Sequence, residues 1–164
     1  MYCRIIPSLL LKEGRLVKGN YQKNYRDAGN PVTTVKAHCF QGADEIIITN
    51  LDKKINIENK VLLEQICAES TVPISYFGGV DSLESFKSIL GIGFDRIGLN
   101  SALLNNTHIL KNISEVYGEQ SVIVGIDLTH KNGVYKILDP VKNKPLDLDI
   151  EKYVNEIENK GVGE

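Results

Sequence analysis

The sequence predicts an α/β fold in which parallel strands are joined by single helices. Short, almost continuous apolar runs alternate with longer segments of helical periodicity, as expected for strands that are buried on both faces. A short motif also recurs: residues 42–46 (GADEI) are echoed by residues 93–97 (GFDRI), and the motif begins again at residues 161–164 (GVGE). Each copy combines the end of a helix, a short bridge and a charged residue that enters a strand. The chain is therefore expected to consist of repeated βα units.

The elements follow one another in regular order. A first strand is expected at residues 4–11, after which Asn30 caps a helix that Pro31 opens and Gly42 ends. Asn132-Gly133 is expected to form the turn of a hairpin. The remaining strands are expected at residues 46–48, 74–77, 97–99, 122–126 and 134–138, and the remaining helices over residues 56–69, from Asp81, up to about Tyr117 and from Asp149.

This order is compatible with an open doubly wound sheet or with a closed barrel. No GxGxxG motif follows the first strand, which disfavours a dinucleotide-binding open sheet, and the repeated motif favours a (βα)8 TIM barrel. A whole barrel needs ~250 residues, whereas residues 1–164 hold about five βα units. We therefore expect one truncated barrel domain that ends where a sixth strand should begin. A frayed tail is the alternative for residues 161–164, but it would leave the last helix without a strand to cover.

Composition limits the classes of function. The net charge is −2 and the pI is about 6.0, with no basic stripe that would indicate nucleic-acid binding. No apolar run reaches the ~20 residues that span a bilayer, and no signal peptide is evident, so a cytoplasmic location is expected. Cys3, Cys39 and Cys67 have unpatterned spacings that favour free thiols. Neither a metal nor another cofactor is expected.

Several segments resemble one known family. They are residues 4–7 (RIIP), 12–19 (KEGRLVKG), 26–32 (RDAGNPV), 42–45 (GADE), 78–79 (GG), 100–101 (NS) and 124–127 (VGID). In this order they closely resemble the cyclase subunit of imidazole glycerol phosphate synthase. The resemblance implies a phosphate-binding barrel of the histidine pathway. It also implies a glutaminase subunit that docks at the bottom of the barrel and sends ammonia through it to an active site at the top.

The resemblance implies a catalytic role for Asp127, at the carboxyl end of the fifth strand. General acid–base chemistry needs a second, opposed carboxylate, but Leu10 stands where the family has an aspartate at the end of the first strand. Asn50 also stands where an aspartate is expected. The leucine-rich first strand resembles cyclase-like paralogues that are associated with the amidation of surface-polysaccharide sugars and work beside a glutaminase-like subunit.

A phosphorylated small molecule is the expected ligand. Backbone N–H groups at a Gly-Gly turn before a helix can approach an anion closely, although turns use glycine for other reasons. The residues expected to bind phosphate or substrate are Gly78, Gly79, Asn100, Ser101, Lys18 and Asn50.

Alternating charges are expected at the strand entrances. The resemblance places Arg4, Glu45, Arg96 and Glu164 in a salt-bridged gate for ammonia, and Asp95 beside it toward the glutaminase partner. Two cations and two anions in such a ring would neutralise each other. Without this compensation, burial of the charges would cost too much free energy. Ordinary solvated charge at strand ends is the alternative for any one of them.

Three hypotheses for function remain open. The first is a synthase-type subunit of a glutamine amidotransferase in the surface-sugar branch. The second is a histidine-pathway cyclase with altered catalysis, and the third is a catalytically inactive barrel fragment. We also expect the isolated chain to self-associate, because the first and fifth strands should expose unpaired edges, and Tyr153 and Val154 should lack a neighbour.

Overall fold

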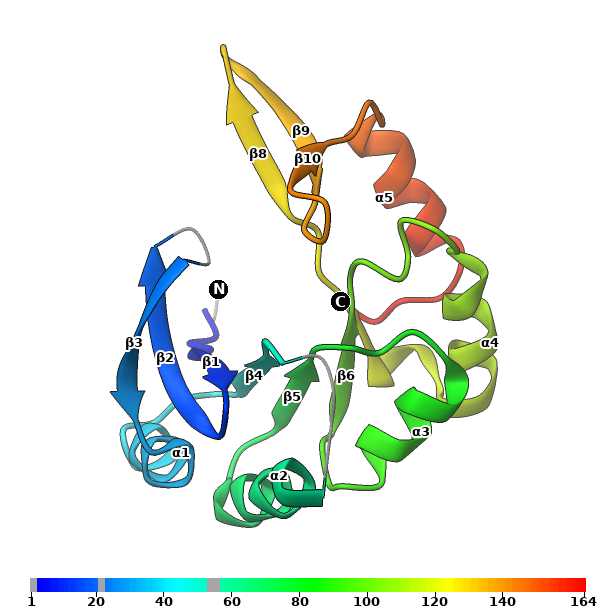
Figure 1. Ribbon diagram of the computed structural model, residues 1–164. Helices are drawn as coiled ribbons and strands as arrows, with labels where there is room; N and C mark the ends of the chain where they lie inside the picture. The colour runs from blue at the N-terminus through cyan, green and yellow to red at the C-terminus, as the bar shows by residue number, and fades with distance from the viewer. Residues whose placement is uncertain (1–2, 21–22, 53–56) are drawn as a thin grey trace. The chain divides into compact units, whose positions relative to one another are not determined.

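A computed structural model describes residues 3–20, 23–52 and 57–164 of the protein (Figure 1). Strands and helices alternate as the sequence predicts, and the α/β class with mainly parallel strands is confirmed. The elements are β1 (Ser8–Lys12), β2 (Arg15–Asn20), β3 (Lys23–Gly29), α1 (Pro31–Phe40), β4 (Ile46–Asn50), α2 (Ile57–Glu69), β5 (Ile74–Phe77), α3 (Leu83–Leu90), β6 (Arg96–Leu99), α4 (His108–Tyr117), η1 (Glu119–Ser121), β7 (Val122–Val124), β8 (Leu128–Lys131), β9 (Val134–Asp139), β10 (Lys144–Pro145) and α5 (Ile150–Glu158).

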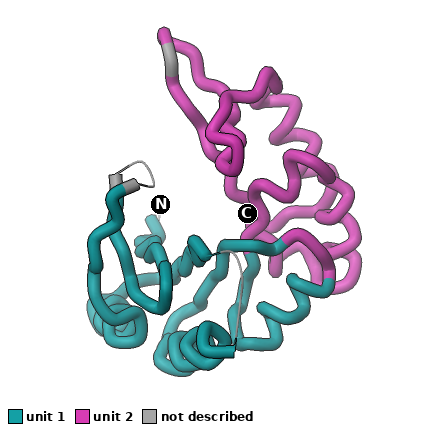
Figure 2. Tube along the Cα trace, viewed as in Figure 1, with its two compact units in different colours: residues 1–80, 84–97 teal, residues 81–83, 98–164 magenta. Residues whose placement is uncertain are grey.

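The chain divides into two compact units (Figure 2). Unit 1 holds residues 1–80 and 84–97, and unit 2 holds residues 81–83 and 98–164. The boundary falls inside β6, so this strand contributes residues to both units. Within the described residues, no helix combines the length and the apolar character that a membrane crossing requires.

Parallel strands form the centre of unit 1. The hydrogen-bonded order is β3-β2-β1-β4-β5-β6, and β4 pairs in parallel with both β1 and β5. The register sets Leu10 opposite Thr49, and Thr49 opposite Phe77. The carboxyl ends of β1, β4 and β5 therefore meet along one edge of the sheet.

One face of these strands forms the core of unit 1. Ile46, Ile48 and Tyr76 are fully buried on this face, and the Tyr76 ring lies 5.0 Å from that of Phe94. Helices α1 and α2 lie side by side against the strands (Figure 1), and their buried side chains include Val35, Leu63 and Ile66. Caps form where the sequence predicts them: the Asn30 side chain accepts a hydrogen bond from the backbone N–H of Thr33 at 3.1 Å.

The expectation of an open edge at the first strand is wrong. Strand β2 pairs antiparallel along β1, with Leu10 opposite Val17, and β3 lies outside β2. Glu13 and Gly14 both have positive φ values, 49° and 74°, which is the geometry of a two-residue hairpin turn. The sequence interpretation treated this segment as a loop and missed the Glu-Gly turn signal.

Unit 2 contains the predicted hairpin. Asn132 and Gly133 adopt φ values of 52° and 79° between β8 and β9, and Lys131 lies opposite Val134. Strand β10 pairs with the other edge of β9. Helix α5 begins after Asp149, whose side chain caps the backbone N–H of Lys152 at 2.9 Å. The predicted hairpin and the predicted start of the last helix are therefore confirmed.

The last residues of the chain pair with β7. The N–H of Gly163 donates to the carbonyl of Val122 at 3.2 Å, and the N–H of Val124 donates to the carbonyl of Glu164 at 2.8 Å. This pairing contradicts a frayed tail, although residues 162–164 are not themselves assigned as a strand. It also removes part of the exposed edge that we expected at the fifth strand.

Helix α5 buries much of its apolar stripe, although Val154 is only half-buried. Tyr153 is 9% exposed and Ile157 is 3% exposed, so the expectation that Tyr153 lacks a neighbour is wrong. The physical reasons given for self-association therefore fail at β1 and at Tyr153. Charged residues on the outermost strand, Arg26 and Asp27, also disfavour edge-to-edge pairing.

Replacing Gly163 by alanine should loosen the pairing with β7. A Cβ atom at this position would lie 2.7 Å from the carbonyl oxygen of Glu119, which belongs to the backbone and yields little. We expect a loss of about 1–3 kcal/mol in the free energy of unfolding, measured by urea denaturation, with faster hydrogen exchange at the Val124 amide. Gly91→Ala is the control, because its nearest contact would be 3.4 Å. Equal stability of the two variants would contradict the prediction.

Candidate functional site

The turn after β5 supplies the predicted anion site of unit 1. Gly78 has φ +133°, and a Cβ atom there would lie 2.3 Å from the carbonyl oxygen of Asn50. Only glycine lets the turn pass this close to the end of β4, so packing already accounts for Gly78. Gly79, with φ +66°, is exposed, and the turn leads toward helix α3. Gly79 is thus the better probe of anion binding, because any side chain at Gly78 would displace β4.

Asn50 is committed to the structure rather than to a ligand. It is 2% exposed, its amide nitrogen donates to the Tyr76 hydroxyl at 3.0 Å, and its amide oxygen accepts from the N–H of Asp52 at 3.1 Å. Burial raises the pKa of Tyr76 to about 12, although the hydrogen bond from Asn50 opposes this. Both ends of the Asn50 amide are occupied, so its predicted contact with substrate has no geometric support.

Lys18 lies on the opposite face of the sheet from Leu10. It is exposed on β2 opposite Arg26. Side chains alternate along a strand, so Lys18 points to the opposite face from Val17 and from its partner Leu10. The structure therefore does not bring Lys18 to the face that carries Leu10.

In unit 2, two predicted residues meet. Asn100 follows β6 and Asp127 follows β7, and the backbone N–H of Gly125 donates to the carbonyl of Leu99 at 2.8 Å. The amide nitrogen of Asn100 donates to a carboxylate oxygen of Asp127 at 2.9 Å. Asn100 was predicted to hold phosphate, but in this structure it orients the carboxylate. Ser101 opens the turn that follows Asn100.

A buried carboxylate gathers the charges at the amino ends of the strands in unit 1. Glu45 is 2% exposed and accepts hydrogen bonds from the Arg96 guanidinium, from the Arg4 guanidinium at 3.5 Å and from the Ser75 hydroxyl at 2.5 Å. Three of the four predicted gate residues therefore meet, whereas Glu164 belongs to unit 2. Burial of a lone carboxylate is costly, and the two guanidiniums with the hydroxyl offset that cost.

The sequence interpretation did not identify Ser75. It is fully buried in β5 between Ile74 and Tyr76. The available signal was a hydroxyl residue inside an apolar strand, because a buried hydroxyl needs a partner. Alternation along β4 and β5, together with the register of Ile47 opposite Ser75, sets Ser75 on the face away from the buried core.

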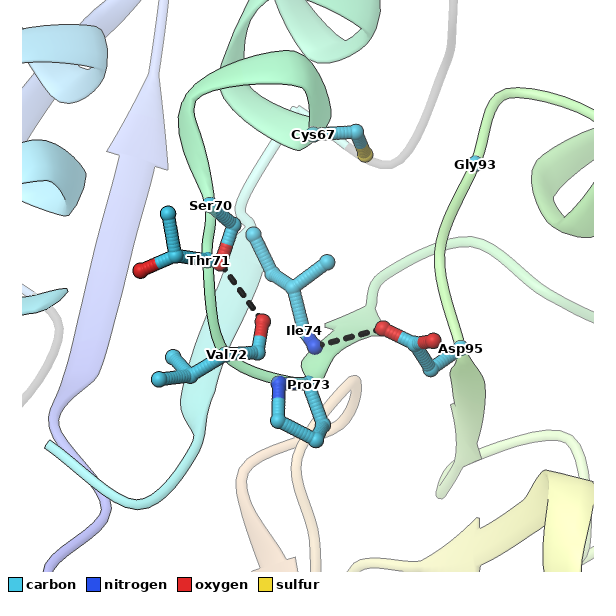
Figure 3. Close-up of a pocket in the computed structure, with 8 residues that line it drawn as sticks. All are labelled: Cys67, Ser70, Thr71, Val72, Pro73, Ile74, Gly93 and Asp95. Carbon is cyan, nitrogen blue, oxygen red and sulfur yellow. Dashed lines mark hydrogen bonds between the residues drawn. The ribbon is translucent and has the colours of Figure 1, made fainter.

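Asp95 has a structural partner of its own. Its carboxylate accepts from the backbone N–H of Ile74 at 2.8 Å, which satisfies the first donor of β5. It also lines a surface pocket of about 320 Å³ with Cys67, Gly93 and residues 70–74 (Figure 3). The expected role of Asp95 toward a partner is therefore not needed to explain its position.

The two thiols near this pocket should differ in reactivity. Burial raises the pKa of Cys67 to about 12. Burial also opposes ionisation of Cys39, but hydrogen bonds from Thr71, Ser70 and Val72 outweigh it and lower the pKa of that thiol. Because the thiolate is the nucleophile, we expect iodoacetamide at pH 8.5 to alkylate Cys39 much faster than Cys67. Peptide mapping by mass spectrometry measures both rates, and equal rates would contradict the prediction.

Removing the Ser75 hydroxyl should destabilise unit 1. Ser75→Ala deprives the buried Glu45 carboxylate of one of its donors, which costs about 1–3 kcal/mol in the free energy of unfolding. Ser75→Thr is the matched control, because it keeps the hydroxyl. Urea denaturation of both variants tests the prediction, and an alanine variant as stable as the unmodified protein would refute it.

Comparison with known proteins agrees with this geometry. The family model described as "Histidine biosynthesis protein" matches residues 4–164. Relatives named imidazole glycerol phosphate synthase subunit HisF include those of Cytophaga hutchinsonii, 31% identical over 163 residues, and Pyrococcus furiosus, 32% identical over 164 residues. Each alignment covers 98% of this chain and 65% of the relative. The relative from Methanocaldococcus jannaschii is 36% identical over 126 residues, which are 76% of this chain and 46% of the relative.

The chain thus spans about 65% of the length of the first two relatives. The family model extends from the first charged residue of the Glu45 cluster, Arg4, to the residue that pairs with β7, Glu164. The parallel βα units and this match together show that the chain belongs to the histidine biosynthesis protein family.

Proposed function

We propose that this chain is part of a cyclase subunit of the imidazole glycerol phosphate synthase type, which acts in histidine biosynthesis on a phosphorylated substrate. The observation that carries the proposal is the family match over residues 4–164. The names of the relatives favour the histidine pathway over the surface-polysaccharide branch that the leucine-rich first strand had suggested.

Asp127 is the proposed catalytic carboxylate. It lies just after a parallel strand, where barrel enzymes carry their catalytic groups, and the hydrogen bond from Asn100 fixes one of its oxygens. A fixed carboxylate can take or return a proton at a defined position on the substrate. Asn100 is therefore proposed to position Asp127.

Leu10 limits the rate of this chemistry. The register sets Leu10, Thr49 and Phe77 side by side, so no carboxylate lies in this row of unit 1. Loss of one member of an acid–base pair lowers the rate by ~10²–10⁴-fold. The proposed subunit therefore binds its substrate but turns it over slowly at best.

The Glu45 cluster supports a proposed route for ammonia from a glutaminase subunit. Arg4, Glu45 and Arg96 form a compact group of charges at the amino ends of the strands. Arg4 is partly accessible, with 46% of its side chain exposed, whereas Glu45 and Arg96 are largely covered. A charged group that reaches from the surface to the interior suits a controlled entrance, and Asp95 of the same unit is proposed to extend it toward the partner.

Activity with added ammonia tests the proposal. The unmodified chain should form little or no imidazole glycerol phosphate from the ribulosyl precursor, because Leu10 cannot transfer a proton. Leu10→Asp should raise turnover at least 10-fold, toward the ~10²–10⁴-fold that an acid–base group contributes. Chromatography of the product measures the rate.

The control is Asp127→Asn in the Leu10→Asp background, which should abolish the gain. Equal turnover of the unmodified chain and Leu10→Asp would contradict the catalytic assignment. If no variant turns over but the precursor still shifts the Gly79 and Asp127 amides, the chain is a binding fragment without catalysis, the third hypothesis.

A further inference from the structure

Two cations lie directly opposite each other on the hairpin of β2 and β3. The register pairs Lys18 with Arg26, and both side chains are exposed. Directly paired residues on neighbouring antiparallel strands share one face of the sheet, with Cβ atoms ~4.5–5.5 Å apart, and like charges in this arrangement are destabilising. We call these two residues the cation pair. The stability of the free hairpin does not explain why they stand together.

No carboxylate of the chain neutralises the cation pair. All 21 aspartates and glutamates fall within residues 3–20, 23–52 and 57–164, which the structure describes, and none of the ion pairs found there includes Lys18 or Arg26. The other arginines of the chain, Arg4, Arg15 and Arg96, each have a carboxylate partner. Arg26 is therefore the exception among the arginines.

The acidic residue next to Arg26 serves the other face of the hairpin. Asp27 lies opposite Val17 in the register, and side chains alternate along a strand, so it points away from the cation pair. Its carboxylate accepts two hydrogen bonds from the Arg15 guanidinium, at 2.9 and 3.1 Å, and one from the N–H of Gly29 at 2.7 Å. One face of the hairpin thus neutralises its own charge, whereas the other face carries two positive charges without a carboxylate.

The chemistry of the two side chains indicates which anion fits. A guanidinium presents a planar fork that matches two phosphate oxygens, and a lysine adds a compact charge to the same group. The chain as a whole carries a net charge of −2, so it does not attract polyanions in general. Nucleic-acid binding also depends on many phosphate contacts, and two cations supply few. A single phosphate group is the better match.

We propose that the cation pair is a binding site for the phosphate group of a small phosphate monoester, on the face of the hairpin opposite to that of Leu10. The bound dianion relieves the repulsion between Lys18 and Arg26, which gives the like-charge pairing a purpose. The site consists of residues of unit 1 only and takes part in no step of the chemistry proposed for Asp127. Its failure would therefore leave the proposed function untouched.

Titration of the full chain at constant ionic strength tests the site, with inorganic phosphate and glycerol 3-phosphate as probes. Nuclear magnetic resonance shifts of the Lys18 amide and of the Arg26 side-chain N–H report binding at the cation pair itself. Lys18→Gln and Arg26→Gln should each weaken the affinity at least about 10-fold, because a hydrogen bond to a charged group is lost. The control is Lys36→Gln, which removes the same charge from an exposed lysine that is paired with Glu69, and which should leave the affinity unchanged.

Stability without phosphate gives a second measurement that does not depend on a bound ligand. Because Arg26→Gln removes the repulsion, its midpoint of urea denaturation should lie above that of the unmodified protein when no phosphate is present. Added phosphate should raise the midpoint of the unmodified protein by preferential binding to the folded state, and should raise that of Arg26→Gln much less.

Three results would overturn the proposal. The first is phosphate affinity that neither Lys18→Gln nor Arg26→Gln alters, which would mean that the anion binds elsewhere. The second is a lower midpoint of Arg26→Gln without phosphate, which would show that Arg26 supports the hairpin. The third is tighter binding of a short oligonucleotide than of glycerol 3-phosphate at the cation pair, which would replace the small ester by a nucleic acid.

Discussion

The parallel register of β1, β4 and β5 is the constraint on which the rest of unit 1 depends. Side chains alternate between the two faces, so a slip of one residue would exchange every buried side chain for a partly exposed one. The register in place buries Ile46, Ile48 and Tyr76 on one face. It sets Leu10, Thr49 and Phe77 on the other face and brings the carboxyl ends of the strands, where ligands are expected, to one edge.

Glu45 joins the stability of this unit to its proposed function. Its carboxylate is almost fully buried, and it persists because two guanidiniums and the Ser75 hydroxyl surround it. Removal of one partner would leave the buried carboxylate less well compensated, which destabilises the unit. The same arrangement, with Arg4 at the surface and Arg96 inside, suits the entrance proposed for ammonia. Stable folding and the proposed passage of ammonia would therefore both require Arg4 and Arg96 to stay paired with Glu45.

Leu10 is the residue that sets the proposed chemistry of this chain apart from two-carboxylate acid–base catalysis. The Asn100–Asp127 pair keeps one oriented carboxylate in unit 2, whereas the carboxyl ends of β1, β4 and β5 in unit 1 present Leu10, Thr49 and Phe77. A chemistry that needs two proton-transfer groups is therefore expected to be slow.

Local patterns in the sequence determined the α/β class, the cap at Asn30, the start of the last helix near Asp149 and the Asn132-Gly133 hairpin, because each depends on neighbouring residues and on periodicity. Tertiary structure decided what depends on distant partners. Strand β2 covers the edge of β1, Asn50 is bound to Tyr76, Asn100 turns to Asp127, and Ser75 reaches Glu45 across 30 positions of the chain. Side-chain hydrogen bonds between strands depend on the strand register and on the face of the sheet to which each side chain points. No local pattern of residues specifies either of these.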